Sequence, residues 1–536
     1  SVSKWAVHVA SSTNVLIERG LPMPDHNVRS ALYRITNGMI TWLSIFLLGV
    51  QPILAQGVVP NAAATGGLSV TAAPNGVPLA NIATPNAQGL SHNLYDRFNV
   101  DADGLVLNNT ADHYAQTQLV GVVPGNANLA TSGAARIILN EVVSANRSTL
   151  GGVVEVAGQS ADVIVANPNG ITCNGCGFIR TPRVVLTTGT PNITGGTLDG
   201  FTVNGGDITF GVNGADLSQV SLFDIISRQV TFDGAVTGQD VRVTTGRNSV
   251  DYATGRVTAS PDDGSTAPDF AIDSTAVGGL YAGRISLLST EAGVAVRAPR
   301  EMAANAGAMT LTADGRLVIG RAQASGPATL RSTAAPVVVE TSLFAGDAIT
   351  LTGVSAEIIA DATLVTEADL TIMADTVTLG TGAIAAAGMD GDGNLGTSGN
   401  LQITTDALLG TNAQIAVAGD AAVRADTITL NQTSAGQSVS VQGDLTVETT
   451  TLSTDGSTVA IGGNATIVGA PDLSISGGTY AIGGDLTVEA DTLTTTATLE
   501  TGGTASLTTR SGNLSNSGTV DAAAILTIAS AGRQCL

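Results

Sequence analysis

The segment Gly443-Asp444-Leu445-Thr446-Val447-Glu448 decides the fold, because the same six residues return at positions 484–489. Related segments pair a small residue with a polar one and continue into a Thr- or Val-rich strand; they begin at residues 346, 368, 399, 419, 463 and 503. Successive starts are separated by 22, 31, 20, 24, 20, 21 and 19 residues. A period of about twenty residues indicates a solenoid in which each repeat forms one coil.

The composition favours strands over helices. The chain has 65 Gly, 3% aromatic, 12% charged and 43% hydrophobic residues, enough apolar surface for a packed interior but few large rings to fill it. Short strands of alternating residue type end in Gly-Gly, Asp-Gly or Gly-Asn turns, and helix-period segments are nearly absent. We therefore predict an all-β, right-handed parallel β-helix (solenoid) with an N-terminal cap and extra-helical strands, because the open end of a solenoid needs shielding.

The longest interval contains the acidic stretch at residues 389–394 (MDGDGN), which resembles the start of a calcium loop. An EF-hand requires Gly at its sixth position and Glu at its twelfth, and these positions are Leu395 and Leu401. We predict a loop inserted between two coils and no metal site.

Residues 39–54 form an apolar run that Arg29 and Arg34 precede and that ends at Ala55 and Gln56. A basic flank, a short apolar core and a small residue at its end are typical of a secretory signal peptide, so we predict cleavage between Ala55 and Gln56. The alternative is a buried core helix. We predict a leader at residues 1–55, a secretion-type β-helical domain at 56–305 and a repeat shaft at 306–536. The chain begins with Ser and ends within its repeat pattern, so we expect it to be a fragment.

The formal net charge is −22 and the only lysine is Lys4. Beyond residue 340 the basic residues are Arg424, Arg510 and Arg533. Such a chain has no basic patch to neutralise phosphates, so nucleic acid is not an expected partner and an anionic lipid surface is disfavoured. The acidity is interpreted as a solubility device for a sheet-rich molecule.

Several ordered blocks resemble the secretion domain of two-partner-secreted exoproteins, the family of filamentous haemagglutinins, high-molecular-weight adhesins, haemolysins and contact-dependent inhibition proteins. They lie at residues 91–100 (SHNLYDRFNV), 104–109 (GLVLNN), 135–142 (ARIILNEV), 165–171 (VANPNGI), 246–252 (GRNSVDY) and 278–285 (GGLYAGRI). The resemblance implies a partner: an outer-membrane barrel transporter with periplasmic recognition domains, which binds the domain before it folds. The repeats after residue 305 match the family only in their general residue pattern, without specific sequence blocks.

The resemblance also implies an export signal made of two Asn-Pro-Asn turns. The second stands intact as Asn167-Pro168-Asn169-Gly170-Ile171. The first departs from the pattern, because Ala replaces Pro in Asn126-Ala127-Asn128-Leu129. Ala accepts the same dihedrals, so the fold prediction stands, while a recognition role for the first turn is weakened. From turn chemistry alone, the intact segment is better interpreted as a purely structural turn, although a turn that the fold needs can also be needed for export.

Cys173 and Cys176 form a C-x-x-C directly after the second turn, and Cys535 lies near the C-terminus. A zinc site would need a second pair of ligands, and a thioredoxin-type centre would need a βαβ context. In an oxidising periplasm we predict a local disulfide rather than a reactive thiol. Cysteine pairs at this point occur in some members of the resembled family.

Catalysis is not predicted. After leader removal the only histidines are His92 and His113, and neither lies beside a nucleophile motif. We predict no cofactor and no enzyme activity in this chain. The expected function is that of a secreted adhesin or haemagglutinin, whose partner would be a receptor or glycan on a host or neighbouring cell. The alternative is the stalk of a cytolysin or contact-dependent growth inhibition toxin, with its effector beyond residue 536. A third possibility is a polysaccharide-binding or polysaccharide-cleaving β-helix.

Overall fold

The computed structural model describes residues 57–433 and 436–535. The predicted leader and the cleavage site at Ala55 and Gln56 lie outside these residues. The described chain consists of short β-strands and one 3-10 helix, η1 (Ala127–Leu129). No helix within it is long and apolar enough to cross a membrane.

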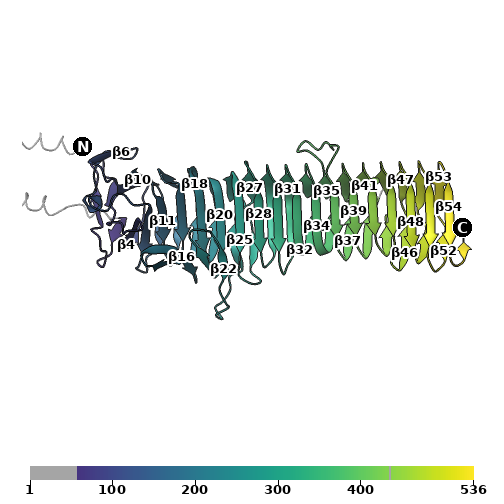
Figure 1. Cartoon of the computed structure of the whole chain (residues 1–536), viewed down its shortest axis with the longest axis horizontal. Helices are drawn as coiled ribbons and strands as arrows, with labels where there is room; N and C mark the ends of the chain where they lie inside the picture. The colour runs from purple at the N-terminus through teal and green to yellow at the C-terminus, as the bar shows by residue number, and fades with distance from the viewer. Residues whose placement is uncertain (1–56, 434–435, 536) are drawn as a thin grey trace, which may run out of the picture. The chain divides into compact units, whose positions relative to one another are not determined.

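The strands stack in parallel, coil upon coil. Strand β42 (Leu445–Glu448) pairs in register with β45 (Ala465–Val468), which pairs with β48 (Leu486–Ala490). Figure 1 shows this stack running in sequence order from β25 (Arg284–Ser289), in teal, to β54 (Leu526–Ser530), in yellow. The predicted parallel β-helix is confirmed.

The repeated segment shows why the pattern stacks. In β42, Leu445 and Val447 are buried in the interior, and the alternating Thr446 and Glu448 are exposed, as period-two strands require. Coil after coil, the interior is filled by Val, Ile, Leu and Ala, and large rings are concentrated in a few coils, such as the stacked pair Phe210–Phe232 at 5.3 Å between centroids. This is the packed interior with few large rings that the composition predicts.

The polar residues at the turns have a role beyond turn formation. Asn464 donates its backbone N–H to Oδ1 of Asp444 at 2.7 Å, and Asp485 donates its backbone N–H to Oδ1 of Asn464 at 2.9 Å. The same bond joins Asp420 to Asn400 and Asp444 to Asp420. These side chains, which the sequence presents as turn formers and solvated charge, form a ladder that connects each coil to the preceding one.

The N-terminal cap is made of antiparallel strands. Strand β1 (Val58–Pro60) pairs with β4 (Leu90–Phe98), and β2 (Ser69–Ala72) forms a hairpin with β3 (Pro78–Asn81). Strand β3 then pairs in parallel with β5 (Leu105–Asn109) in the stack. The predicted cap is confirmed.

Two groups of extra-helical strands cover the outside of the first coils. One is an antiparallel sheet of β15 (Thr190–Thr194), β16 (Thr197–Val203), β21 (Asn248–Asp251) and β22 (Val257–Ala259). Its apolar face, including Phe201 and Val250, packs on Ile164 and Val185 of the stack. The other is the hairpin of β6 (Tyr114–Thr117) and β7 (Gly121–Pro124).

The β6–β7 hairpin is held by a buried carboxylate. Glu155, on β10 (Val153–Gly158), is fully buried, and its oxygens accept the backbone N–H groups of Gln118 at 2.8 and 2.9 Å and of Leu119 at 2.9 Å. Val123 on the inner face of the hairpin packs with Val106 of the stack. A buried carboxylate satisfied by backbone donors fixes the hairpin in one position.

The inserted loop lies between β35 (Ile384–Ala387) and β36 (Leu401–Thr404). Oδ1 of Asp390 accepts the backbone N–H groups of Asp392 at 3.0 Å and Asn394 at 2.8 Å, so this carboxylate closes the loop. Across residues 57–433 and 436–535, no group of three or more His, Cys, Asp or Glu side chains is placed to hold a metal ion.

Candidate functional site

The intact asparagine turn connects β11 (Asp162–Ala166) to β12 (Ile171–Cys173). The backbone N–H of Gly170 donates to the carbonyl oxygen of Asn167 at 3.0 Å, which closes a β-turn with Pro168 and Asn169 at its two central positions. Pro168 and Asn169 are exposed, whereas Asn167 and Ile171 are fully buried. The turn therefore has an outward tip and two buried anchors.

The side chain of Asn167 uses both of its polar atoms. Its Nδ2 donates to the carbonyl oxygen of Asn146 and to Oγ of Ser148, both at 2.9 Å. Its Oδ1 accepts the backbone N–H of Asn169 at 3.0 Å. A carboxylate could not make these two donations, so only an amide fits this buried position.

The first turn has the same chemistry although it lacks the proline. Asn126 is buried and caps η1; its Oδ1 accepts the backbone N–H of Asn128 at 3.0 Å. Its Nδ2 donates to the carbonyl oxygens of Ile82 at 2.9 Å and Asn108 at 3.0 Å. Ala in place of Pro therefore leaves this bonding pattern intact.

The third residue of each turn reaches back to an earlier segment. Nδ2 of Asn128 donates to the carbonyl oxygens of Gly67 and Ile82, both at 2.9 Å, and Nδ2 of Asn169 donates to that of Ser144 at 2.7 Å. Leu129, like Ile171, is buried in the main core. Both turns thus fasten a new segment onto chain that precedes it in sequence.

Arg147 is a residue of this site that the sequence does not single out. Its guanidinium makes two bonds to Asp207, with Nη1 2.7 Å from Oδ1 and Nη2 2.6 Å from Oδ2, and Nη2 also donates to the carbonyl oxygen of Ile171 at 3.1 Å. These bonds hold the pKa of Asp207 below its usual value. A Cβ on Gly170, whose φ is +102°, would lie 2.2 Å from Nη1, so Gly170 makes room for this bridge.

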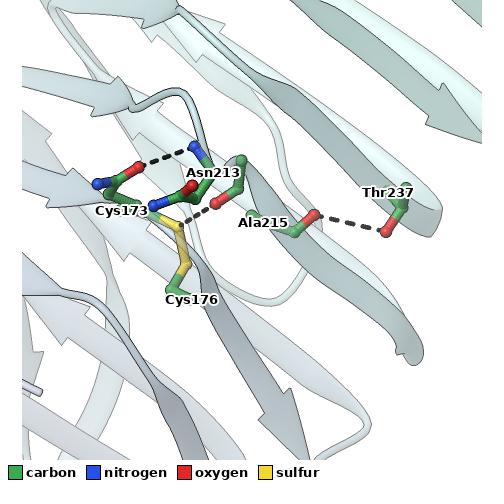
Figure 2. Close-up of a disulfide and its surroundings, with 7 residues drawn as sticks. Cys173, Cys176, Asn213, Ala215 and Thr237 are labelled. Atoms are coloured by element: carbon green, nitrogen blue, oxygen red, sulfur yellow. Dashed lines mark hydrogen bonds between the residues drawn. A yellow bond between two sulfur atoms is a disulfide. The ribbon is translucent and has the colours of Figure 1, made fainter. Parts of the chain in front are cut away.

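Cys173 and Cys176 form a disulfide between the end of β12 and the start of β13 (Cys176–Ile179), as Figure 2 shows. Both cysteines belong to the main core and are at most 1% exposed. The short connection is bound to the following coil, because Asn213 donates its backbone N–H to Oδ1 of Asn174 at 2.9 Å. A pair buried this deeply has a structural role and no access to a substrate thiol.

Neither histidine side chain is bonded to an asparagine turn in the described residues, although the backbone N–H of Gly125, just before the first turn, donates to the carbonyl oxygen of His113 at 2.9 Å. His92 is on β4, with its Nε2 2.6 Å from Oε2 of Glu141. His113 is exposed in the connection before β6.

The cap, the extra-helical strands and the two asparagine turns define a capped parallel β-helix with a distinct N-terminal domain. Residues 53–319 match the family model "TPS secretion domain". This segment therefore belongs to the TPS secretion domain family, the secretion domain of exoproteins that two-partner systems of Gram-negative bacteria export through the periplasm to the cell surface. The resemblance inferred from the sequence blocks is confirmed.

Relatives match more than half of the chain at over 40% identity. The chain is 45% identical over 289 residues to "tRNA nuclease CdiA" of Yersinia mollaretii, covering 54% of this chain and 10% of the relative. It is 43% identical over 324 residues to "16S rRNA endonuclease CdiA" of Enterobacter cloacae, covering 60% and 10%. The chain thus spans about a tenth of the length of these curated relatives.

A solved structure, "Crystal structure of filamentous hemagglutinin secretion domain", is 28% identical to this chain. The alignment covers 68% of this chain and 99% of that one, with a TM-score of 0.43.

Proposed function

We propose that residues 57–319 carry the export signal of a long exoprotein, and that an outer-membrane transporter with periplasmic recognition domains binds this segment before it folds. The burial of Asn126 and Asn167 carries this proposal. Both side chains are enclosed and fully bonded in the folded domain, so a partner can contact their amides only in the unfolded chain. Residues 126, 128, 129 and 167–171 are the proposed recognition elements.

Folding outside the outer membrane then makes transport of the chain directional. Each coil that emerges buries its aliphatic residues and bonds to the coil already outside, and this gain opposes backward movement. The periplasm holds no ATP, so the free energy of stacking is the available driving force.

The test is export of point variants. Asn167→Asp and Asn169→Asp should each block surface delivery while precursor accumulates in the periplasm, measured by surface labelling and by fractionation. Glu489→Gln, at an exposed shaft position, is the matched control and should be exported normally. Normal surface delivery of both Asp variants would refute the assigned role.

For the whole protein we propose two activities. The first is adhesion, with the β-helical shaft presenting a surface to a receptor or glycan on another cell. The second is delivery of a toxin, with this chain as the stalk and an effector domain further along the protein. The names of the relatives, which are nucleases and toxins of the CdiA type, favour the second activity. The nuclease chemistry in those names would belong to the effector.

The coding sequence beyond residue 536 distinguishes the two activities. A compact, separately folding domain at the far end would support toxin delivery, and a continued repeat array without one would support adhesion. A neighbouring gene for an outer-membrane barrel is expected in both cases.

A further inference from the structure

A groove of about 650 Å³ runs along the shaft between residues 352 and 470. Its floor is built from small residues, one from each coil: Gly353, Ala374, Thr405, Ala425 and Thr449. The two threonine hydroxyls are turned to the backbone, donating to the carbonyl oxygens of Asp375 at 3.0 Å and Asp426 at 3.1 Å. The floor is therefore low and continuous across the coils.

One wall consists of the residues that precede the floor in each coil. Met373, Thr404, Arg424 and Glu448 stack in register along it, and Nη1 of Arg424 is 3.3 Å from Oε2 of Glu448. Met373 is 42% exposed and gives this wall an apolar contact.

The other wall is a row of carboxylates. Asp375, Asp406 and Asp426 follow the floor residues in three successive coils, and their backbones are joined by bonds such as Asp406 N–H to the carbonyl oxygen of Asp375 at 2.9 Å. Successive coils place these side chains about 4.8 Å apart. In the part of the chain that the structure describes, none of the three forms a salt bridge.

The groove thus carries four carboxylates against one guanidinium, and that guanidinium is already paired. A linear ligand lying along the stacking axis would meet one aspartate per coil. Repeated ammonium groups would satisfy this row, whereas sulfated or uronic acid chains would be repelled by it.

We propose that this groove binds a linear oligosaccharide that carries free amino groups. The aspartate row accepts the ammonium groups, and the hydroxyl of Thr404 and the Arg424–Glu448 pair bond the sugar hydroxyls. Met373 packs against an apolar ring face. Binding uses only the folded shaft, so it is independent of the export role proposed above.

The test is isothermal titration of the purified chain with a glucosamine hexasaccharide at low and physiological salt. Binding should weaken as salt rises. The double variant Asp406→Asn/Asp426→Asn should bind about tenfold more weakly or worse, because two charge-assisted contacts are lost. Thr404→Trp should block the groove without changing its charge. Glu489→Gln, which extends the first wall beyond Val468 and outside the groove, should bind like the parent chain.

Two further ligands test whether the groove recognises the amino groups, the sugar, or both. The fully N-acetylated hexasaccharide should bind much more weakly, because it keeps the hydroxyls and loses the charges; equal binding would overturn the assignment of the aspartate row. Spermine tests charge alone, and binding as tight as that of the amino sugar would overturn the proposed sugar. No binding of the glucosamine hexasaccharide would overturn the proposal outright. Circular dichroism of each variant verifies that the β-helix is retained.

Discussion

Replacing Asn167 by Ala tests whether the second asparagine turn stabilises the fold as its geometry implies. The substitution removes two donations, to Asn146 and Ser148, and one acceptance, from the backbone of Asn169. Asn167 and Ser148 are fully buried, whereas Asn146 and Asn169 are exposed. At about 1 kcal/mol for each of the three bonds, the local loss is roughly 3 kcal/mol.

The exposed Asn169 supplies the matched control. Asn169→Ala loses the bond to the carbonyl oxygen of Ser144 and a longer one to Asn167, at a position open to water, so its cost is about 1 kcal/mol.

Hydrogen exchange measures both effects locally, which suits a stacked protein whose coils need not unfold together. The backbone amide of Ser148 donates to the carbonyl oxygen of Gly170 and reports opening of this turn. Its exchange should accelerate by at least about a hundredfold in Asn167→Ala and by about tenfold or less in Asn169→Ala. Equal acceleration in the two variants would show that the buried amide of Asn167 stabilises the turn no more than the exposed Asn169 does, which would refute the prediction.

Three further substitutions probe neighbouring features. Ala127→Pro should increase the free energy of unfolding by about 0.4–1 kcal/mol and so raise the thermal midpoint, because Asn126 already has the extended backbone that precedes proline (φ −81°, ψ 114°). A lower midpoint would contradict this prediction. Glu155→Gln should make the β6–β7 hairpin the first site of limited proteolysis, because a neutral amide oxygen replaces the carboxylate that holds it; unchanged cleavage would argue against this anchor. The lowered pKa of Asp207 predicts that its bridge to Arg147 stabilises the fold above about pH 4 and that this stabilisation is lost on further acidification. Asp207→Asn should therefore lower the thermal midpoint at pH 7 and make the midpoint fall less steeply as the pH is lowered. If the midpoints of the variant and the parent chain fall in parallel, the bridge is not the source of the acid sensitivity.

The stacked fold could be predicted because it repeats locally. Each copy of the segment at 443–448 carries its own strand alternation and its own turn residues. Because the copies follow one another at a fixed spacing, their apolar side chains can all be buried only if the copies stack as successive coils. The same reasoning predicted the cap, since an open stack exposes both core and strand edges. The proposed boundary at residues 305 and 306 remains a prediction.

The bonds between distant segments could not be predicted in this way. Arg147 and Asp207 are 60 residues apart, and nothing in either neighbourhood indicates a pair. Glu155 looks like any outward residue of a strand until the hairpin that covers it is placed. The turn ladder is an intermediate case, because the sequence shows Asp444 and Asn464 at turns without revealing that one accepts the backbone N–H of the other.

The side-chain hydrogen bonds of the two asparagine turns also imply an order of folding that fits the proposed export. The side-chain donors of Asn126 and Asn167 all reach segments earlier in the chain, 18 to 44 residues upstream, and in the shaft Asp444 likewise donates its backbone N–H to Asp420. A turn of this kind can close only after the preceding coil is in place, which is the order in which a chain emerges from a pore N-terminus first. The same amide is then free for a transporter on one side of the membrane and enclosed in the fold on the other, so one residue can serve recognition and stability in succession.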